Sequence, residues 1–261
     1  MNAPAVLSPE LLVNRVEKTY PDGTRALDET RLEVQRGDFV SLLGPSGCGK
    51  STLLKLCAGL EQPSAGQLRW RGAATPAAGG QRLAMVFQEA TLMPWATVAA
   101  NVRLPLDLQG LPRATADARV AQALAQVGLA GFDRHYPRQL SGGMQMRVSI
   151  ARALATEPEL LLMDEPFGAL DEFTRHKLDT DLRALWQARG LTVVFVTHSI
   201  YEAVYLSTRV VMMAARPGRV VADVAITETV RDDEFRLSPA FSGYCRALSG
   251  RLQAVSGPAP H

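Results

Sequence analysis

The chain has 261 residues, of which 47% are hydrophobic and 21% charged, a balance typical of a folded protein and too apolar for a disordered one. Its 28 basic residues exceed its 26 acidic residues by so little that charge alone does not indicate a nucleic-acid groove. Because a single hydrophobic core stops growing near roughly 250–300 residues, we expect a main domain with a smaller subdomain.

The cysteines and the first residues bear on where the protein works. Cys48, Cys57 and Cys245 show no CxxC spacing for zinc or redox chemistry, so we expect reduced thiols in a cytosolic protein. Residues 1–10 lack the basic and apolar regions of a signal peptide, and no run approaches the ~18 apolar residues of a membrane span. We therefore expect a chain that is neither exported nor membrane-spanning.

The first predicted elements form an antiparallel sheet and then a strand–loop–helix unit. Apolar and polar residues alternate over 11–20 and 31–35, which is typical of half-exposed strands, with a turn predicted at 21–23. The apolar run 39–43 reads as a buried strand, followed at once by a glycine-rich turn and a helix over 51–60.

A small helical subdomain is predicted next. Residues 62–82 are rich in Gly, Pro and Ala around a short strand at 67–70, which indicates surface loops. Between 96 and 127 the apolar spacing becomes helical, and Gly128 stands where a C-cap glycine is expected.

The rest of the chain predicts a parallel α/β core and a short tail. The apolar runs 160–163 and 193–196 are bare of polar alternation, as strands covered on both faces are. After Gly218 we expect a weak strand, one helix near 235–252, and a frayed end over 257–260.

The strongest motif is a P-loop. Residues 44–51 match G-x-x-x-x-G-K-[ST] between a predicted strand and a predicted helix, as the motif requires. The glycines let backbone N–H groups converge on phosphate oxygens, Lys50 offsets β/γ-phosphate charge and Ser51 can ligate Mg²⁺. The alternative is a glycine-rich turn with a solvated lysine. The candidate nucleotide-binding residues here are Gly44, Pro45, Ser46, Gly47, Cys48, Gly49, Lys50, Ser51 and Thr52.

Two adjacent carboxylates follow the predicted strand 160–163. Neighbours on a strand point to opposite faces, so Asp164 and Glu165 each need a partner of their own. With a P-loop upstream, Asp164 is the candidate to hold Mg²⁺ and Glu165 the candidate to take a proton from an attacking water. Taken alone, the pair is more often a charge complement to a helix N-terminus.

A third segment, Leu140-Ser141-Gly142-Gly143-Met144, opens a predicted helix. Serine with two glycines before a helix builds another anion-binding N-terminus, although by itself Ser-Gly-Gly is a common loop. The chain therefore offers Ser141, Gly142 and Gly143 as a second phosphate cradle.

Together these motifs resemble those of the ATP-binding cassette (ABC) ATPases, whose signature motif is LSGGQ-like, and the resemblance spans roughly residues 13–219. It implies an α/β P-loop NTPase core with a mostly parallel sheet (1–88 and 158–220), including an N-terminal antiparallel β subdomain. It also implies a helical signature subdomain (89–157) and a short C-terminal extension (221–261). One residue departs from the family pattern, because Met144 stands where the signature often has glutamine.

Four further residues have roles that only the resemblance implies. Tyr20 matches the adenine-stacking aromatic, or it is a strand tyrosine with a wet hydroxyl. Gln88 matches the glutamine that reaches Mg²⁺ and the attacking water, and His198 matches the switch histidine that contacts the γ-phosphate and holds Glu165 and water in line. Asp171 matches the aspartate that lines the interface between two cassettes; otherwise it is a helix cap.

The resemblance also implies partners. In this family ATP is sandwiched between the P-loop of one cassette and the signature of another. The resemblance therefore implies ATP and Mg²⁺ as cofactors and a second cassette as partner, which we expect to be an identical chain. Separate transmembrane permease subunits would dock near Gln88 and residues 92–95, where Trp95 is otherwise core. A periplasmic or lipid-anchored solute-binding protein would act indirectly, nucleic acid is not a partner, and the chain would lie peripherally on the cytoplasmic face of the inner membrane.

Residues 93–95, 166–175 and 197–207 resemble the nitrate, sulfonate and taurine group of bacterial importers. The predicted function is thus ATP hydrolysis that energises import of a small solute. The alternative is an ABC-type ATPase of DNA repair or another non-transport process. Such repair proteins are split by long coiled coils, and Gln88 and Ser141 lie too close in sequence for that insertion. A P-loop kinase or GTPase explains the first motif only.

Overall fold

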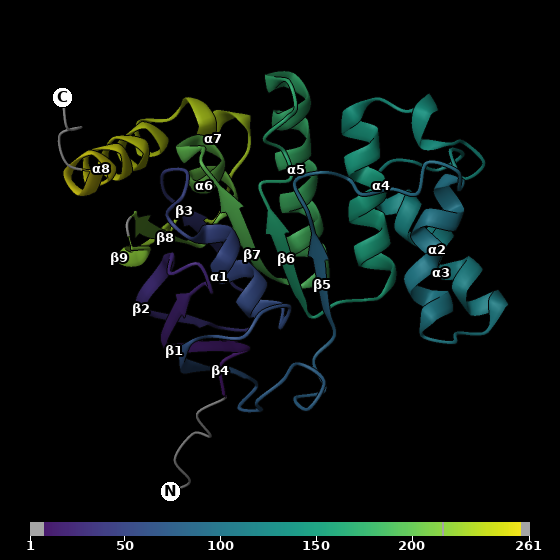
Figure 1. Cartoon of the computed structure of the whole chain (residues 1–261). Helices are drawn as coiled ribbons and strands as arrows, with labels where there is room; N and C mark the ends of the chain where they lie inside the picture. The colour runs from purple at the N-terminus through teal and green to yellow at the C-terminus, as the bar shows by residue number, and fades with distance from the viewer. Residues whose placement is uncertain (1–7, 216, 257–261) are drawn as a thin grey trace, which may run out of the picture.

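The structure is a computed structural model that describes residues 8–215 and 217–256. Two sheets organise it, a three-stranded sheet in the order β2-β1-β4 and a six-stranded sheet in the order β5-β6-β7-β3-β8-β9. The three-stranded sheet lies at lower left in Figure 1, the helical subdomain at right and the C-terminal helices at upper left. The predicted α/β class with an N-terminal antiparallel sheet is confirmed; the predicted fraying of 257–260 lies outside the described residues.

The antiparallel sheet consists of β1 (Leu11–Thr19), β2 (Arg25–Val34) and β4 (Ala65–Trp70), with β1 paired to both neighbours. The turn at 21–23 is confirmed, because the Gly23 amide donates to the Tyr20 carbonyl at 2.9 Å. β2 starts earlier than the predicted strand at residue 31. Register shifts along β1 and β2 interrupt the alternation of apolar and polar residues, so the pattern alone finds only the regular end of β2.

The six-stranded sheet is parallel except at one edge. β5 (Leu83–Val86), β6 (Leu160–Asp164), β7 (Thr192–Thr197), β3 (Phe39–Leu43) and β8 (Arg209–Ala214) run parallel. β9 (Arg219–Ala225) confirms the weak strand expected after Gly218, and it pairs antiparallel with β8, a pairing that the sequence did not predict. Because β9 belongs to this sheet, we place the start of the C-terminal extension after Ala225 rather than at residue 221.

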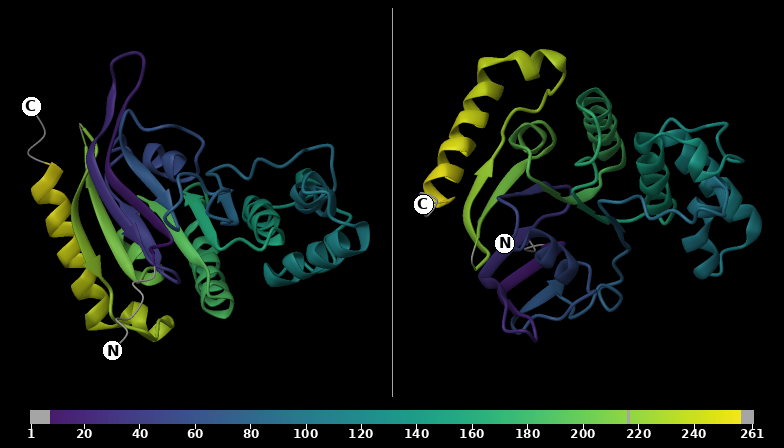
Figure 2. Two further views of the ribbon diagram at one scale, coloured as in Figure 1. Left: turned by 90° about the horizontal axis from the view of Figure 1, so that it is seen from below. Right: turned by 45° about the horizontal axis from the view of Figure 1, so that its top comes forward.

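Alternate residues of the buried strands pack into two separate cores, as strands covered on both faces require. Leu42, Val194 and Leu162 pack with α1 (Lys50–Cys57) and the antiparallel sheet. Leu43, Phe195 and Met163 pack on the other side, with α5 (Glu172–Arg189) and α6 (Ile200–Leu206). Figure 2 shows α1 and α5 on opposite faces of the sheet. The sheet therefore holds the ends of β3, β6 and β7 at one edge.

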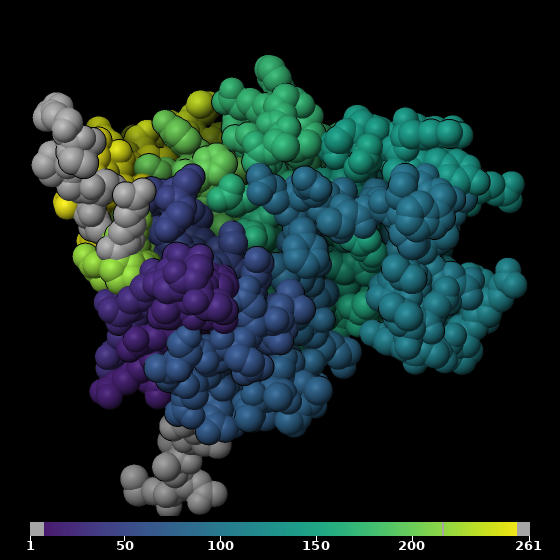
Figure 3. Space-filling model, in the orientation of Figure 1, coloured from purple at the N-terminus to yellow at the C-terminus, as the bar shows by residue number. Residues whose placement is uncertain are grey.

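The helical subdomain contains α2 (Val98–Leu108), α3 (Arg113–Gln126), a 3₁₀ turn at Pro137–Gln139 and α4 (Gly142–Ala155). The helical run predicted over 96–127 is two helices, because Gly110 adopts a left-handed φ of 72° after α2 and Pro112 is the N-cap of α3. Gly128, at φ 69°, follows the end of α3 as predicted. Figure 3 shows the subdomain as a lobe on the side away from the antiparallel sheet.

The C-terminal extension packs against α6. The single helix predicted near 235–252 is two helices, α7 (Asp233–Leu237) and α8 (Pro239–Ser256), which meet at Ser238. The rings of Phe241 and Tyr201 stack with centroids 6.0 Å apart, and Arg231 donates to the carbonyls of Val204 and Tyr205. Within the described residues, every helix is too short or too polar to cross a membrane.

Candidate active site

The P-loop connects β3 to α1 in a backbone path that only glycine can follow. Gly47 and Gly49 have φ of 76° and 85°, in the left-handed region. A Cβ at Gly49 would lie 2.6 Å from Leu27 Cδ2 and 2.8 Å from the Ala26 carbonyl, and one at Gly44 would lie 2.4 Å from the Met213 carbonyl. The loop is thus fitted against β2 and β8, and its amides precede the N-terminus of α1, where an anion is stabilised.

Lys50 is held inside this loop. Its side chain is only 5% exposed, and its ammonium donates to the carbonyls of Gly44 at 2.9 Å and Pro45 at 3.1 Å. The same nitrogen lies 3.8 Å from Glu165 Oε1. The loop borders a cavity of about 430 Å³ that Arg25, Glu165 and Gly218 also line. A buried ammonium beside backbone N–H groups gives this cavity the chemistry of a phosphate site.

Ser51 and Asp164 meet at the carboxyl ends of β3 and β6. The Ser51 hydroxyl donates to Asp164 Oδ1 at 2.9 Å. Burial raises the pKa of Asp164, and the neighbouring Glu165 carboxylate raises it further. A hydroxyl and a desolvated carboxylate in contact are the oxygen ligands that Mg²⁺ takes, and a cation there would restore charge balance to Asp164. These two residues therefore fit a magnesium ion.

Glu165 lies between Lys50 and His198. Its backbone has φ of 44°, a left-handed conformation that costs a non-glycine residue about 1–3 kcal/mol. The Glu165 Oε2 lies 3.2 Å from His198 Nδ1, whereas Asp164 Oδ1 accepts from Ser51. The expectation that the two carboxylates have separate partners agrees with these contacts. A carboxylate held beside a phosphate cavity is placed to accept a proton from water.

Tyr20 and Gln88 lie near this centre but do not line its cavity. The Tyr20 hydroxyl lies 3.2 Å from Thr52 Oγ1, so it is bound to the helix that follows the P-loop. Gln88 follows β5, whose Val86 is in register with Met163 of β6, so it stands at the same edge as Asp164. Its side chain is exposed and has no hydrogen-bond partner among residues 8–215 and 217–256.

The signature segment stands apart from the P-loop. Ser141 is the N-cap of α4 and accepts from the Met144 amide at 3.3 Å. A Cβ at Gly143 would lie 2.6 Å from Thr174 Cγ2, so close packing of α4 on α5 needs glycine there. In Figure 1, α4 and α1 lie on opposite sides of β5 and β6. The P-loop cavity includes none of Ser141, Gly142 and Gly143 among its lining residues.

Asp171 is a helix cap in this structure. It precedes α5 and accepts from the Thr174 amide at 3.0 Å, and this hydrogen bonding lowers the pKa of its carboxyl. The role of Asp171 at an interface between cassettes stays a prediction. Trp95 is 77% exposed, so its interpretation as core is wrong, and its docking role also stays a prediction.

Sequence reasoning missed a link behind the active site. Arg175 of α5 donates to the Leu170 carbonyl at 2.9 Å, in the loop that follows Glu165, and lies 3.5 Å from Glu202 Oε1 of α6. Glu202 in turn accepts from the Thr197 hydroxyl, next to His198. No local pattern marks this link, because its members come from two helices and a strand end.

Gly218 was missed for the same reason. A Cβ there would lie 2.3 Å from the Cys48 carbonyl, so a residue far along the chain supports the P-loop. Cys48 and Cys57 are buried, Cys245 is half-buried, and all three are free thiols, as expected. Burial raises the pKa of Cys57 to about 12, so it is not a reactive thiolate.

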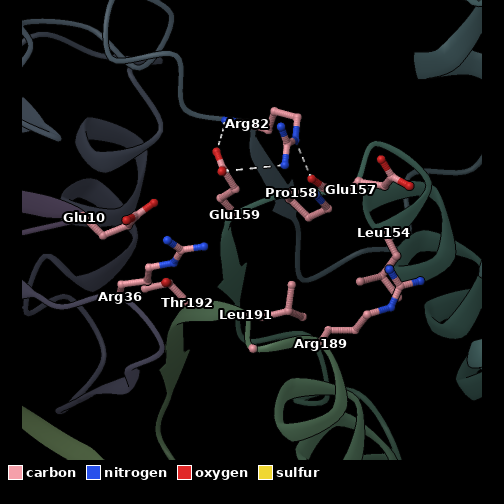
Figure 4. A pocket seen from close by; sticks show the side chains of 11 residues that line it. Glu10, Arg36, Arg82, Leu154, Glu157, Pro158, Glu159, Arg189, Leu191 and Thr192 are labelled. Carbon is pink, nitrogen blue, oxygen red and sulfur yellow. Dashed lines mark hydrogen bonds and ion pairs between the residues drawn. The ribbon is translucent and has the colours of Figure 1, made fainter.

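A second hollow, of about 280 Å³, lies at the opposite edge of the sheet, where β6 and β7 begin. Figure 4 shows Arg82 reaching Glu157 and Glu159 across it. The Arg82 guanidinium donates to the Glu157 carbonyl at 2.8 Å and lies 3.6 Å from Glu159 Oε1. Its lining includes no glycine-rich loop that leads into a helix N-terminus, so the phosphate-site chemistry lies at the other edge of the sheet, where open α/β sheets place their ligands.

Comparison with known proteins gives consistent results. The family model described as ABC transporter matches residues 27–168. An uncharacterized ABC transporter ATP-binding protein of Methanocaldococcus jannaschii is 50% identical over 88% of this chain and 85% of its own length. A taurine import ATP-binding protein of Chromobacterium violaceum is 47% identical over 81% of each chain. The dimeric structure of a post-hydrolysis ATP-binding cassette bound to ADP and phosphate has a TM-score of 0.73 and 33% identity, and the match covers 84% of this chain and 99% of that one.

Proposed function

The chain belongs to the ABC transporter family and is an ATPase, and from this premise we propose that it energises a bacterial importer of a small solute of the nitrate, sulfonate and taurine type. One observation carries the proposal. The chain contains a formed P-loop centre, and the N-terminus of its signature helix α4 lies outside that centre. The 47% identity to a taurine import ATP-binding protein supports the solute class.

We assign the chemistry to residues of this chain. Lys50 and the P-loop amides bind the β- and γ-phosphates. Ser51, Asp164 and Gln88 would hold Mg²⁺, which would offset phosphate charge. Glu165 takes the proton from the attacking water, and His198, at 3.2 Å from its Oε2, keeps that carboxylate in line. Tyr20 supplies an aromatic face for adenine, since its hydroxyl is anchored to Thr52 beside the loop.

The second half of the nucleotide site comes from another cassette. Ser141 and the amides of Gly142 and Gly143 open α4 outside the P-loop cavity of their own chain. We therefore propose a homodimer in which these groups bind the partner's ATP, with Asp171 at the interface. Loss of the γ-phosphate removes charge shared by the two chains and opens the dimer.

The permease contact is proposed at the helical subdomain. Trp95 exposes 77% of its surface beside the segment that follows Gln88, and a large exposed aromatic side chain is typical of a protein interface. A membrane permease docked there would place the chain at the cytoplasmic face of the membrane, with a solute-binding protein on the other side.

Reconstitution tests the importer. We expect the chain, combined in liposomes with the membrane protein encoded beside it, to drive ATP-dependent uptake of radiolabelled taurine or an alkanesulfonate, and E165Q to abolish uptake. Magnesium chelation should stop turnover as well. Assemblies that hydrolyse ATP without taking up any of these anions would contradict the solute class. Failure to assemble with a membrane protein would contradict the importer.

A further inference from the structure

A third cavity, of about 680 Å³, lies behind the active site, where α5, α6 and the C-terminal helices meet. It shares no lining residue with the P-loop cavity, and none of its residues is among those proposed to bind ATP. Residues from four helices line it, including Asp179 on α5, Glu202 and Tyr201 on α6, Arg236 on α7 and Phe241 on α8.

The floor of this cavity holds a carboxylate without a partner. Asp179 is 1% exposed, and neither of its oxygens has a hydrogen-bond partner among the described residues. Its nearest cation is Arg236, at 3.7 Å from Oδ2. Burial raises the pKa of Asp179 to about 8, with the Glu202 carboxylate as the next cause. Leaving a buried polar group without a hydrogen bond is unfavourable, so a donor that reached Asp179 would be favoured.

Acidic side chains outnumber basic ones around this cavity. Glu172, Glu202 and Asp233 join Asp179 in lining the cavity, against the guanidiniums of Arg175 and Arg236 and the side chain of His176. Both guanidiniums have other contacts. Arg236 lies over the Tyr205 ring at 3.4 Å from its centroid, and Arg175 donates to the Leu170 carbonyl.

We propose that this cavity binds a small organic ammonium ion, with the ammonium donating to Asp179. An inorganic cation fits less well, because the described residues contain no cluster of three or more metal-ligating side chains. Glu172 and Asp233 line the cavity and are exposed, so they form a second group of carboxylates at its mouth, above Asp179. The stacked rings of Tyr201 and Phe241 form an apolar wall. A short alkyl chain with an ammonium at each end can pair one ammonium with Asp179 and the other with the carboxylates at the mouth, while its methylenes pack on the rings.

A ligand bound in this cavity would affect the active site through Arg175. This side chain pairs with Glu202 and holds the loop after Glu165, so an ammonium that draws Asp179 and Glu202 to itself competes with that pair. Binding therefore lowers ATP turnover. The effect on turnover rests on the role proposed for Glu165, whereas binding itself does not.

Calorimetry with the full chain tests binding. Titration with 1,4-diaminobutane should give saturable heat, n-butylamine should bind more weakly, and butane-1,4-diol, which has the same length without charge, should not bind. D179N should weaken the diamine at least tenfold, and Glu172→Gln at the mouth should weaken it less. Because the acid is protonated below about pH 8, binding at pH 7 should release a proton, seen as a dependence of the heat on the buffer's ionisation enthalpy.

The folded state of D179N is checked separately. The pKa of Asp179 is higher in the folded chain than its ordinary 3.8, so the wild type loses stability as pH rises from about 4 to about 8. D179N escapes that loss and should melt no lower than wild type at pH 9. No binding at about 10 mM diamine, unchanged affinity in D179N, or equal binding of the diol would overturn the site. Binding without any fall in turnover would overturn the coupling, and basal turnover without ligand reports the proposed ATPase role independently.

Discussion

The P-loop centre and the signature segment both lie at helix N-termini and are both proposed to bind phosphate, yet only the P-loop centre is complete within this chain. Lys50, Ser51, Asp164 and Glu165 already contact one another across β3, β6 and α1. Ser141, in contrast, makes a cap hydrogen bond within its own helix and is exposed. The P-loop centre is therefore a formed site, whereas the signature segment is an exposed helix N-terminus.

This difference fits the role proposed for ATP as a switch. In the proposed dimer, the formed site would bind the triphosphate, and the open cradle of the second chain would supply N–H donors to the outer side of the γ-phosphate. Charge-assisted hydrogen bonds of this kind contribute about 1.5–3 kcal/mol each. Variants in the two regions should consequently fail in different ways.

The largest effect is expected from Glu165→Gln in the formed region. The amide keeps the size of the side chain but cannot accept the proton, so turnover should fall by about 10²–10⁴ while ATP still binds. With cleavage blocked, an ATP-dependent dimer should accumulate in size-exclusion chromatography. The exposed Glu234→Gln on α7 serves as control and should be unchanged. Turnover retained in Glu165→Gln would assign the base elsewhere.

Lys50→Ala should act at an earlier step. It removes the buried ammonium that we propose contacts the phosphates, so affinity for a fluorescent ATP analogue should fall by at least about 10–100-fold, which corresponds to the loss of one charge-assisted hydrogen bond. Lys177→Ala, an exposed lysine on α5, controls for loss of one positive charge. Equal affinity in the two variants would argue against a phosphate contact at Lys50.

The sequence predicts the formed region well because its information is local. The P-loop residues 44–51 fix a strand, a turn and a helix within a few positions, and the carboxylates follow their strand directly. What the sequence does not reveal depends on residues distant in the chain. Gly218 under Cys48 and the Arg175–Glu202 pair become visible only once β9 and α6 are in place.

The errors in element boundaries have equally local causes. α2 and α3 share one apolar periodicity, which hides the break at residues 109–112. Likewise, Ser238 caps α8 through the Phe241 amide at 3.1 Å, a signal too short to separate α7 from α8 in the apolar pattern. Serine is a strong cap, but capping identifies a helix start only when the backbone geometry is known.

Ser141→Ala tests the open region. Losing the cap should cost about 1 kcal/mol of stability, and losing the hydroxyl from the partner's nucleotide should lower turnover by roughly tenfold and weaken the ATP-dependent dimer. Thr97→Ala is the matched control, since Thr97 caps α2 in the same way, accepting from the Ala100 amide at 3.2 Å. Both variants should lose similar stability in thermal melts. Only Ser141→Ala should lose dimer, and equal turnover in the two would reduce Ser141 to a cap.

Met144→Gln should have the smallest effect, because it alters a side chain in a region where backbone groups supply most of the contact. Met144 is half-buried against the hydrophobic core, and its amide, which a glutamine retains, is already bonded to Ser141. A neutral hydrogen bond gained by glutamine contributes about 1 kcal/mol, and apolar packing lost at the same position offsets part of it, so turnover should change by less than about fivefold. Steady-state ATPase assays across ATP concentrations measure the change. A hundredfold rise in turnover would mean that the side chain at position 144, rather than the backbone amides of the signature segment, limits how tightly one chain binds its partner's nucleotide.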